Sequence, residues 1–178
     1  FEDVLTTLLA VPELEQVAVA TVCPIAGKIA KKYGTSVLFT EKDEGQTAAV
    51  TQTAEILESK RVAKMLMLPG DVPLVTVEEI QTVIATHENA CSTPDVPAMT
   101  IVPARDEQGS NCIVLSPPTA APLRFGPNSY FPHLETARKL GVSLQTLKLS
   151  GIGLVIDAPV DLLELGRQTV QTRAQNYL

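Results

Sequence analysis

The run Lys64-Met65-Leu66-Met67-Leu68 is nearly continuous in apolar residues, and Pro69-Gly70 ends it. Such a run is typical of a central strand that is covered on both faces of its sheet. The next segment, from Val77 to His87, has the apolar spacing of a helix. A fully covered strand followed by a helix favours a layered α/β arrangement.

The rest of the chain continues this alternation. Short apolar segments predict further strands at 17–22, 37–40, 99–102, 112–115, 144–149 and 153–156. Apolar residues at helical spacing predict helices at 1–9, 25–33, 48–59, 130–140 and from 160 onward. We therefore predict a single α/β domain over residues 1–178, with a three-layer, mostly parallel sheet and helices on both faces. Ligands of such sheets bind beyond the carboxyl ends of the strands.

Charge, hydropathy and cysteine spacing exclude several kinds of binding partner. The chain has 178 residues and a net charge of -6, so its overall field would not gather a nucleic-acid backbone. No segment approaches the roughly 18 uncharged apolar residues of a membrane span. The three cysteines, Cys23, Cys91 and Cys112, are widely spaced and form no C-x-x-C pair. This cysteine pattern argues against disulfides and zinc and predicts a cytoplasmic protein. The charge and the short apolar segments predict a partner that is neither nucleic acid nor membrane.

The beginning of the sequence leads to two expectations. The chain opens at Phe1, inside an amphipathic helical pattern and without an initiating Met. We therefore expect the natural start to lie upstream. The apolar face of this first helix needs either the upstream segment or a second copy of the chain to cover it, which leaves a homo-oligomer open.

Two aspartates directly follow predicted strands. Asp71 comes after the first apolar run, and Asp157 follows the predicted strand at 153–156. Asp71 has two interpretations, a turn residue that accepts a hydrogen bond from a backbone N–H group or a magnesium ligand beside a phosphate. Asp161 lies in the first turn of the last helix, where stabilisation of the helix dipole explains its presence. We treat Asp161 as structural.

A candidate phosphate site lies in Arg124-Phe125-Gly126-Pro127-Asn128-Ser129. Asn128 or Ser129 is first of all a helix N-cap, worth about 1 kcal/mol. A helix N-terminus reached through Gly126 also offers free N–H groups to an anion, so phosphate binding is the second interpretation. Ser110 is likewise either a turn residue or a second donor to phosphate.

Other catalytic and nucleotide-binding motifs are missing from the sequence. Cys112 lies in an apolar run and is predicted to be a buried small hydrophobe rather than a nucleophile. No G-x-x-x-x-G-K-S/T loop is present, and Gly151-Ile152-Gly153 lacks the third glycine of G-x-G-x-x-G. These observations argue against Cys-His catalysis, a P-loop ATPase and an ordinary dinucleotide enzyme.

Three motifs follow one another in a distinctive order. They are Leu68-Pro69-Gly70-Asp71-Val72-Pro73-Leu74, then Val102-Pro103-Ala104-Arg105-Asp106 with Gly109-Ser110-Asn111, then the segment from Arg124 to Ser129. Together they resemble the 2-phospholactate guanylyltransferase family, and the similarity runs from Phe1 to about Leu163. That family is similar in fold to the nucleotide-diphospho-sugar and molybdopterin nucleotidyltransferases.

The resemblance implies a magnesium-dependent guanylyltransferase of deazaflavin coenzyme synthesis. Such enzymes join GMP from GTP to a phosphorylated three-carbon acid and release pyrophosphate. The acid is 2-phospholactate, phosphoenolpyruvate or 3-phosphoglycerate, and the sequence leaves the choice open. By the resemblance, Asp71 and Asp157 hold magnesium, while Ser110, Gly126 and Ser129 bind the phosphate of the acceptor.

Three features depart from the family pattern. Val155 stands where the family has the first acid of an acid-x-acid pair, so one metal ligand is missing. Thr47 replaces an asparagine in the stretch before the third helix and is assigned to the nucleotide by the resemblance. The family's first strand and basic loop, which bind the triphosphate, would lie upstream of Phe1. Two alternatives stay open: a same-fold transferase that uses CTP or another nucleotide, and a non-catalytic homologue that binds a phosphorylated ligand.

Overall fold

A mixed four-stranded sheet forms the centre of the molecule. The computed structural model describes residues 1–38, 44–91 and 96–178. In spatial order the strands are β3 (Met65–Met67), β5 (Ser110–Ser116), β4 (Ala98–Pro103) and β6 (Ser143–Thr146). β5 runs antiparallel to both of its neighbours, whereas β4 and β6 pair in parallel. Three of the four strands therefore share one direction, as expected of a mostly parallel sheet.

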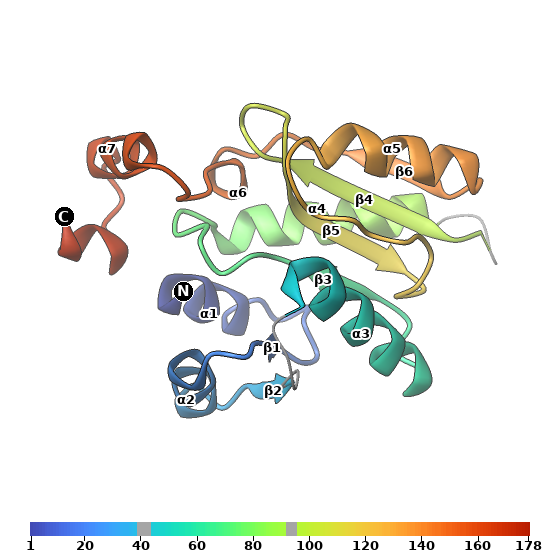
Figure 1. Cartoon of the computed structure of the whole chain (residues 1–178), viewed down its shortest axis with the longest axis horizontal. Helices are drawn as coiled ribbons and strands as arrows, with labels where there is room; N and C mark the ends of the chain where they lie inside the picture. The colour runs from blue at the N-terminus through green and yellow to red at the C-terminus, as the bar shows by residue number, and fades with distance from the viewer. Residues whose placement is uncertain (39–43, 92–95) are drawn as a thin grey trace.

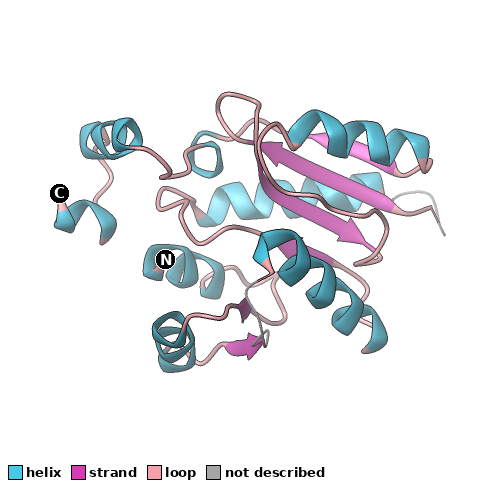
Figure 2. Ribbon diagram, in the orientation of Figure 1, coloured by secondary structure: helices cyan, strands magenta, loops and turns pink. Residues whose placement is uncertain are grey.

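Helices cover both faces of this sheet, which confirms the three-layer prediction (Figure 1; Figure 2). Ile101 and Ile113 point to the face that α3 (Gly45–Ser59) and α5 (Tyr130–Lys139) cover. Val102 and Cys112 point to the opposite face, covered by α1 (Glu2–Leu9) and α4 (Val77–Ala90). Successive residues of a strand face opposite sides, and both sides are buried here. This burial explains why these strands are continuous in apolar residues.

A smaller unit packs beside α1. It consists of the parallel strands β1 (Ala18–Ala20) and β2 (Ser36–Leu38), with α2 (Pro24–Lys32) between them. Leu5 of α1 packs into this unit, and Val4 packs into the main core. The apolar face of α1 is thus already covered within the chain and gives no argument for a second copy. Residues 39 and 40 of the strand predicted at 37–40 lie outside the described residues.

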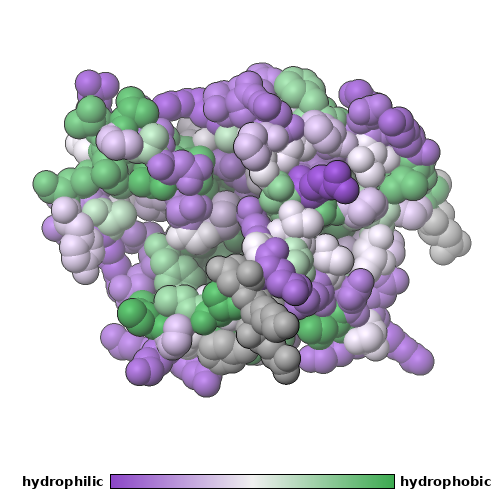
Figure 3. Space-filling model, in the orientation of Figure 1, coloured by the Kyte–Doolittle hydropathy of each residue, from purple (hydrophilic) through white to green (hydrophobic). Residues whose placement is uncertain are grey.

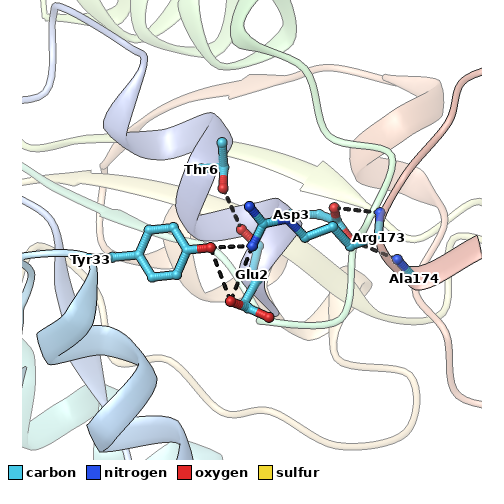
Figure 4. Close-up of polar contacts among 6 residues, drawn as sticks. All are labelled: Glu2, Asp3, Thr6, Tyr33, Arg173 and Ala174. Carbon is cyan, nitrogen blue, oxygen red and sulfur yellow. Dashed lines mark hydrogen bonds and ion pairs between the residues drawn. The ribbon is translucent and has the colours of Figure 1, made fainter. Parts of the chain in front are cut away.

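The C-terminal segment returns to the N-terminal helix (Figure 4). It follows α7 (Pro159–Arg167) and ends in the 3-10 helix η1 (Ala174–Tyr177). The backbone N–H groups of Arg173 and Ala174 donate to the Asp3 carboxylate at 2.9 and 3.1 Å. The guanidinium of Arg173 also donates to Glu2 and to the hydroxyl of Tyr33. These contacts attach the C-terminal segment to α1 and α2.

α7 and the residues that follow it carry exposed apolar side chains. In the space-filling view, hydrophobic residues gather over this end of the molecule, among hydrophilic ones (Figure 3). The exposed side chains are Val160, Leu162, Leu163, Val170 and Leu178.

The strand predicted at 153–156 is wrong. Residues 150–153 instead form the short helix α6 (Ser150–Gly153), and residues 154–157 have no regular structure. The backbone groups that a strand would use have other partners: Gly153 O accepts from Arg105 N at 2.9 Å, and Ile156 N donates to Asp71 O at 3.0 Å. The preceding strand is also shorter than predicted, because β6 ends at Thr146.

Cys112 is buried, as the sequence predicts. All three cysteines are free thiols, and Cys112 has no exposed surface. Burial raises the pKa of Cys112 to about 12, so its thiol stays protonated near neutral pH. Within residues 1–38, 44–91 and 96–178, no helix is both long and apolar enough to cross a bilayer.

Candidate active site

A cavity of about 700 Å³ opens at the end of the sheet near α6. Figure 1 shows this end of the sheet, with α6 beside it. β3 and β4 both end at this edge, and the antiparallel strand β5 begins there. The cavity therefore lies where α/β sheets bind their ligands. Five of the six predicted site residues line it, namely Asp71, Ser110, Gly126, Ser129 and Asp157.

Asp71 and Asp157 come together from separate segments. Asp71 follows β3, whereas Asp157 lies between α6 and α7 rather than at the end of a strand. The hydrogen bond from Ile156 N to Asp71 O joins the two segments. Partial loss of hydration raises the pKa of Asp71, and the neighbouring Asp157 carboxylate raises this pKa further. Two carboxylates that repel one another in one cavity form a suitable site for a cation.

Asp161 fixes the backbone that carries Asp157. Its Oδ2 accepts hydrogen bonds from Asp157 N at 3.1 Å and from Ala158 N at 2.8 Å. These N–H groups directly precede α7 and have no partner within the helix itself. The helix dipole also favours a carboxylate at this end. The structural role predicted for Asp161 is confirmed, although its side chain also lines the cavity.

Glu79 and Asn111 position α6, the short helix that precedes Asp157. The Glu79 carboxylate accepts from Gly151 N at 2.7 Å and from Ile152 N at 3.1 Å. Asn111 Nδ2 donates to Ile152 O at 2.8 Å. A carboxylate and an amide thus fix both the N–H and the C=O groups of one turn. Local sequence signals assign this role to neither residue, although Asn111 belongs to the Gly109-Ser110-Asn111 motif.

Ser110 and Ser129 meet in the wall of the cavity. Ser110 begins β5, Ser129 immediately precedes α5, and their hydroxyl oxygens are 3.4 Å apart. The N-cap role predicted for the Ser129 side chain is wrong, because it makes no capping hydrogen bond. Its backbone has φ -72° and ψ -21°, which are helical angles, whereas a capping side chain requires an extended N-cap residue. The hydroxyl of Ser129 is therefore directed to Ser110 instead.

Gly126 gives the loop before α5 its course. Its φ of +141° lies in a region that favours glycine, while a Cβ atom would meet nothing within 4 Å. Backbone conformation, not space, therefore requires glycine at this position. The Arg124 side chain is exposed and lies outside the cavity lining.

Buried His133 of α5 lies behind the two serines. It is 2% exposed, and its Nδ1 is 2.9 Å from Ser110 Oγ. Its Nε2 accepts a hydrogen bond from Arg124 N at 2.9 Å. Burial lowers the pKa of His133, so the ring is neutral near pH 7. No local sequence signal predicts a role for this histidine.

Thr47 supports the cavity wall rather than lining it. Its hydroxyl accepts from Phe125 N at 2.9 Å, and the adjacent residue Gln46 lines the cavity. The nucleotide-binding role assigned to Thr47 stays a prediction, and Gln46 is the neighbour whose side chain has access to a ligand.

The cavity is acidic. Asp71, Asp106, Asp157 and Asp161 line it, and Arg105 is the one basic side chain among the described residues that do so. Val155 also lines it, so an apolar side chain occupies the position beside Asp157. Nowhere in the described part of the chain do three or more His, Cys, Asp or Glu side chains gather into a metal-binding group. The cavity thus offers a cation two protein carboxylates and space for other oxygen ligands.

The fold and this cavity define the class of protein. The structure matches the crystal structure of a putative nucleotide-diphospho-sugar transferase from Desulfovibrio desulfuricans, with a TM-score of 0.73 and 14% sequence identity. The match covers 98% of this chain and 77% of that chain. The predicted nucleotide-diphospho-sugar-transferase-like fold is confirmed, and this fold defines the structural class of the protein.

The sequence places the chain in a particular family of this class. The model of the family described as "Guanylyl transferase CofC like" matches residues 3–178, and the chain belongs to that family. It is 26% identical over 173 residues to the phosphoenolpyruvate guanylyltransferase of Conexibacter woesei, covering 97% of this chain and 75% of the relative. It is 29% identical over 144 residues to the 3-phospho-D-glycerate guanylyltransferase of Colwellia psychrerythraea, covering 81% and 65%. Across such relatives, the aligned region spans between 41% and 75% of their own length.

Proposed function

We propose that the protein is a magnesium-dependent guanylyltransferase that transfers GMP from GTP to a phosphorylated three-carbon acid in deazaflavin coenzyme synthesis. Membership of the guanylyltransferase family carries this proposal. The names of two relatives point to phosphoenolpyruvate and 3-phosphoglycerate as acceptors, and 2-phospholactate is the third candidate. A cavity lined by the hydroxyls of Ser110 and Ser129 and by the carboxylates of Asp71 and Asp157 supports it.

The residues that line the cavity suggest one part for the acceptor and another for the metal ion and the nucleotide. Ser110 and Ser129, with the backbone around Gly126, would bind the acceptor through its oxyanions. An oxygen of the acceptor phosphate would attack the α-phosphorus of GTP, forming one P–O bond while the bond to the bridging oxygen breaks and pyrophosphate leaves. No side-chain nucleophile is required, because positioning and charge stabilisation supply the rate.

Asp71 and Asp157 would hold the magnesium ion. Oxygen ligands suit this cation, which commonly takes one or two protein carboxylates and completes its shell with water and substrate phosphates. Burial raises the pKa of Asp71 and the Asp157 carboxylate raises it further, and a divalent cation would relieve the repulsion between the two carboxylates. The cation also resolves an electrostatic conflict, since a triphosphate is otherwise repelled by a cavity with four aspartates and one arginine. When bound, it would stabilise negative charge on the transferred phosphoryl group.

The decisive experiment measures pyrophosphate release by the full-length protein. We expect release with GTP and magnesium only when one of the three acids is present. Parallel reactions with ATP, CTP and UTP test the choice of base. Equal release with CTP would make the protein a same-fold transferase of different specificity. Acceptor binding without pyrophosphate release from any nucleotide would identify a non-catalytic homologue instead.

Ser129→Ala tests the acceptor side of the cavity. Loss of one hydroxyl donor to an oxyanion is expected to raise the KM of the acid about tenfold and to leave the KM of GTP unchanged. Thermal stability should hardly change, because the Ser129 hydroxyl makes no capping bond. Ser59→Ala is the matched control, since that hydroxyl contacts only Ile56 O at the end of α3. Equal increases in both KM values would reject the assignment.

A further inference from the structure

The hydrogen bond from the backbone N–H group of Arg124 determines the tautomer of His133. Arg124 N is an amide and can only donate, so Nε2 of the ring must carry the lone pair that accepts this bond. A neutral imidazole has one N–H group, which then lies on Nδ1. The contact between His133 Nδ1 and Ser110 Oγ at 2.9 Å is therefore a hydrogen bond donated by the histidine.

This assignment limits what the two serine hydroxyls can do. Ser110 and Ser129 together have two hydroxyl hydrogens, and the contact between their oxygens uses at most one. Because His133 supplies a hydrogen of its own to Ser110, the other hydroxyl hydrogen has no acceptor among the contacts of this pair. Both serines line the cavity, so the free donor is available to a ligand there.

We propose that His133 is a positioning residue that keeps this serine pair as a hydrogen-bond donor to an oxyanion of the acceptor. The inference rests on the proposed function, because it needs the acceptor to bind on this wall. With the opposite tautomer, Nδ1 would accept from Ser110 and remove the donor that faces the cavity. A cationic ring would place its Nε2–H group against the N–H group of Arg124. Burial, which lowers the pKa of His133, keeps the ring neutral.

His133 also joins the two segments that carry the acceptor site. One ring nitrogen contacts the first residue of β5, and the other contacts the loop before Gly126. The ring of Phe125 packs edge-on against the imidazole, with 5.5 Å between the ring centroids. A single buried side chain thus fixes both the direction of the Ser110 hydroxyl and the loop that leads to Ser129.

Two substitutions of His133 test its contact with Ser110 separately from its contact with Arg124. In His133→Gln the amide oxygen reaches the former Nε2 position and accepts from Arg124, whereas the donor to Ser110 is lost. We expect the KM of the acid to rise about tenfold, with kcat and the KM of GTP close to those of the parent protein. In His133→Asn the amide nitrogen replaces Nδ1 as the donor. This variant should be less stable but keep an acceptor KM close to that of the parent.

A double-mutant cycle distinguishes positioning from simple support. Ser110→Ala alone should raise the KM of the acid, and adding His133→Gln should raise it no further, because the hydroxyl that His133 positions is gone. If His133 only supports the fold, the two effects multiply and the KM of GTP rises as well. That result would overturn the inference.

The tautomer can be measured without any variant or substrate. Nuclear magnetic resonance of protein labelled with ¹⁵N-histidine should show the Nδ1–H tautomer for His133 at neutral pH. The sequence contains one other histidine, His87, and the spectrum of His133→Gln identifies its signals. An Nε2–H or cationic ring, with normal turnover of the parent protein, would overturn this inference alone. No turnover with any of the three acids would instead refute the proposed function and, with it, the acceptor assignment.

Discussion

Asp71→Asn is expected to lower turnover by at least about a hundredfold while the protein stays folded. The substitution keeps the shape of the side chain and removes one of the four aspartate carboxylates that line the cavity. Partial burial and Asp157 both raise the pKa of Asp71, and together they outweigh the backbone hydrogen bond that favours its ionised form. Its Tm without metal should be unchanged or slightly higher, because repulsion between the carboxylates is removed.

Magnesium provides a second measurement of the same variant. The raised pKa means that the ionised carboxylate destabilises the folded protein, and this penalty grows as the pH rises through that pKa. A divalent cation that binds both carboxylates should therefore raise the Tm of the parent protein at neutral pH, but not that of Asp71→Asn. Calorimetry with and without magnesium measures the difference.

Asp3→Asn is the matched control for these experiments. Asp3 lies outside the cavity and accepts from two backbone N–H groups of the C-terminal segment. Its substitution should lower the Tm and leave turnover per folded molecule intact. If Asp71→Asn gave this same pattern, Asp71 would be the structural turn residue of the first interpretation.

The cavity residues could be predicted because they follow from local signals. Asp71 comes directly after a strand that is recognisable by its apolar run, and the edge where such strands end is the usual ligand site. Ser110 and Ser129 flank elements whose boundaries the sequence indicates closely. The motifs around these residues also resemble a known family, and membership of a guanylyltransferase family confirmed that resemblance.

The residues that hold the cavity together could not be predicted, because their partners are distant in the sequence. His133 contacts a serine 23 positions away, and Glu79 binds a backbone group 72 positions away. Glu79 even occupies the fourth position of Thr76-x-x-Glu79, a pattern that usually directs the carboxylate back to the helix N-cap. The Thr76 half of that pattern is present, with a 3.1 Å bond from Glu79 N, but the Glu79 carboxylate binds α6 instead.

The strand predicted at 153–156 is wrong for the same reason, because contacts with residues distant in the sequence decide the local structure. Short apolar runs such as Leu154-Val155-Ile156 fit a buried strand and a buried loop equally well, and periodicity does not separate them. Just before this run, Gly151 N donates to Glu79 and Ile152 O accepts from Asn111, and these hydrogen bonds hold the backbone in a helical turn. Asp157 nevertheless lies near Asp71, because the bond between Ile156 N and Asp71 O brings the two segments together.

Gly151→Ala tests whether that helical turn positions Asp157. A Cβ atom at Gly151 would lie well inside 3.0 Å of both Leu74 O and the Glu79 carboxylate, and its first neighbour is backbone, which cannot rotate away. Relief therefore requires α6 to move and to lose its short hydrogen bonds to Glu79. We expect the free energy of unfolding to fall by about 3 kcal/mol, from overpacking together with the weakened charged hydrogen bonds.

Turnover of Gly151→Ala should fall by at least about tenfold per folded molecule, because a displacement of about 1 Å in a positioned group is enough to do this. The measurement is made at low temperature, where the variant is still folded, and circular dichroism gives the folded fraction. Gly166→Ala is the control: its Cβ would meet only Leu178 Cδ1 at an ordinary 3.7 Å. Alanine within α7 should stabilise the protein by about 0.5–1 kcal/mol and leave turnover unchanged. Parental stability and turnover in Gly151→Ala would mean that α6 has room to move and that Glu79 does not fix the position of Asp157.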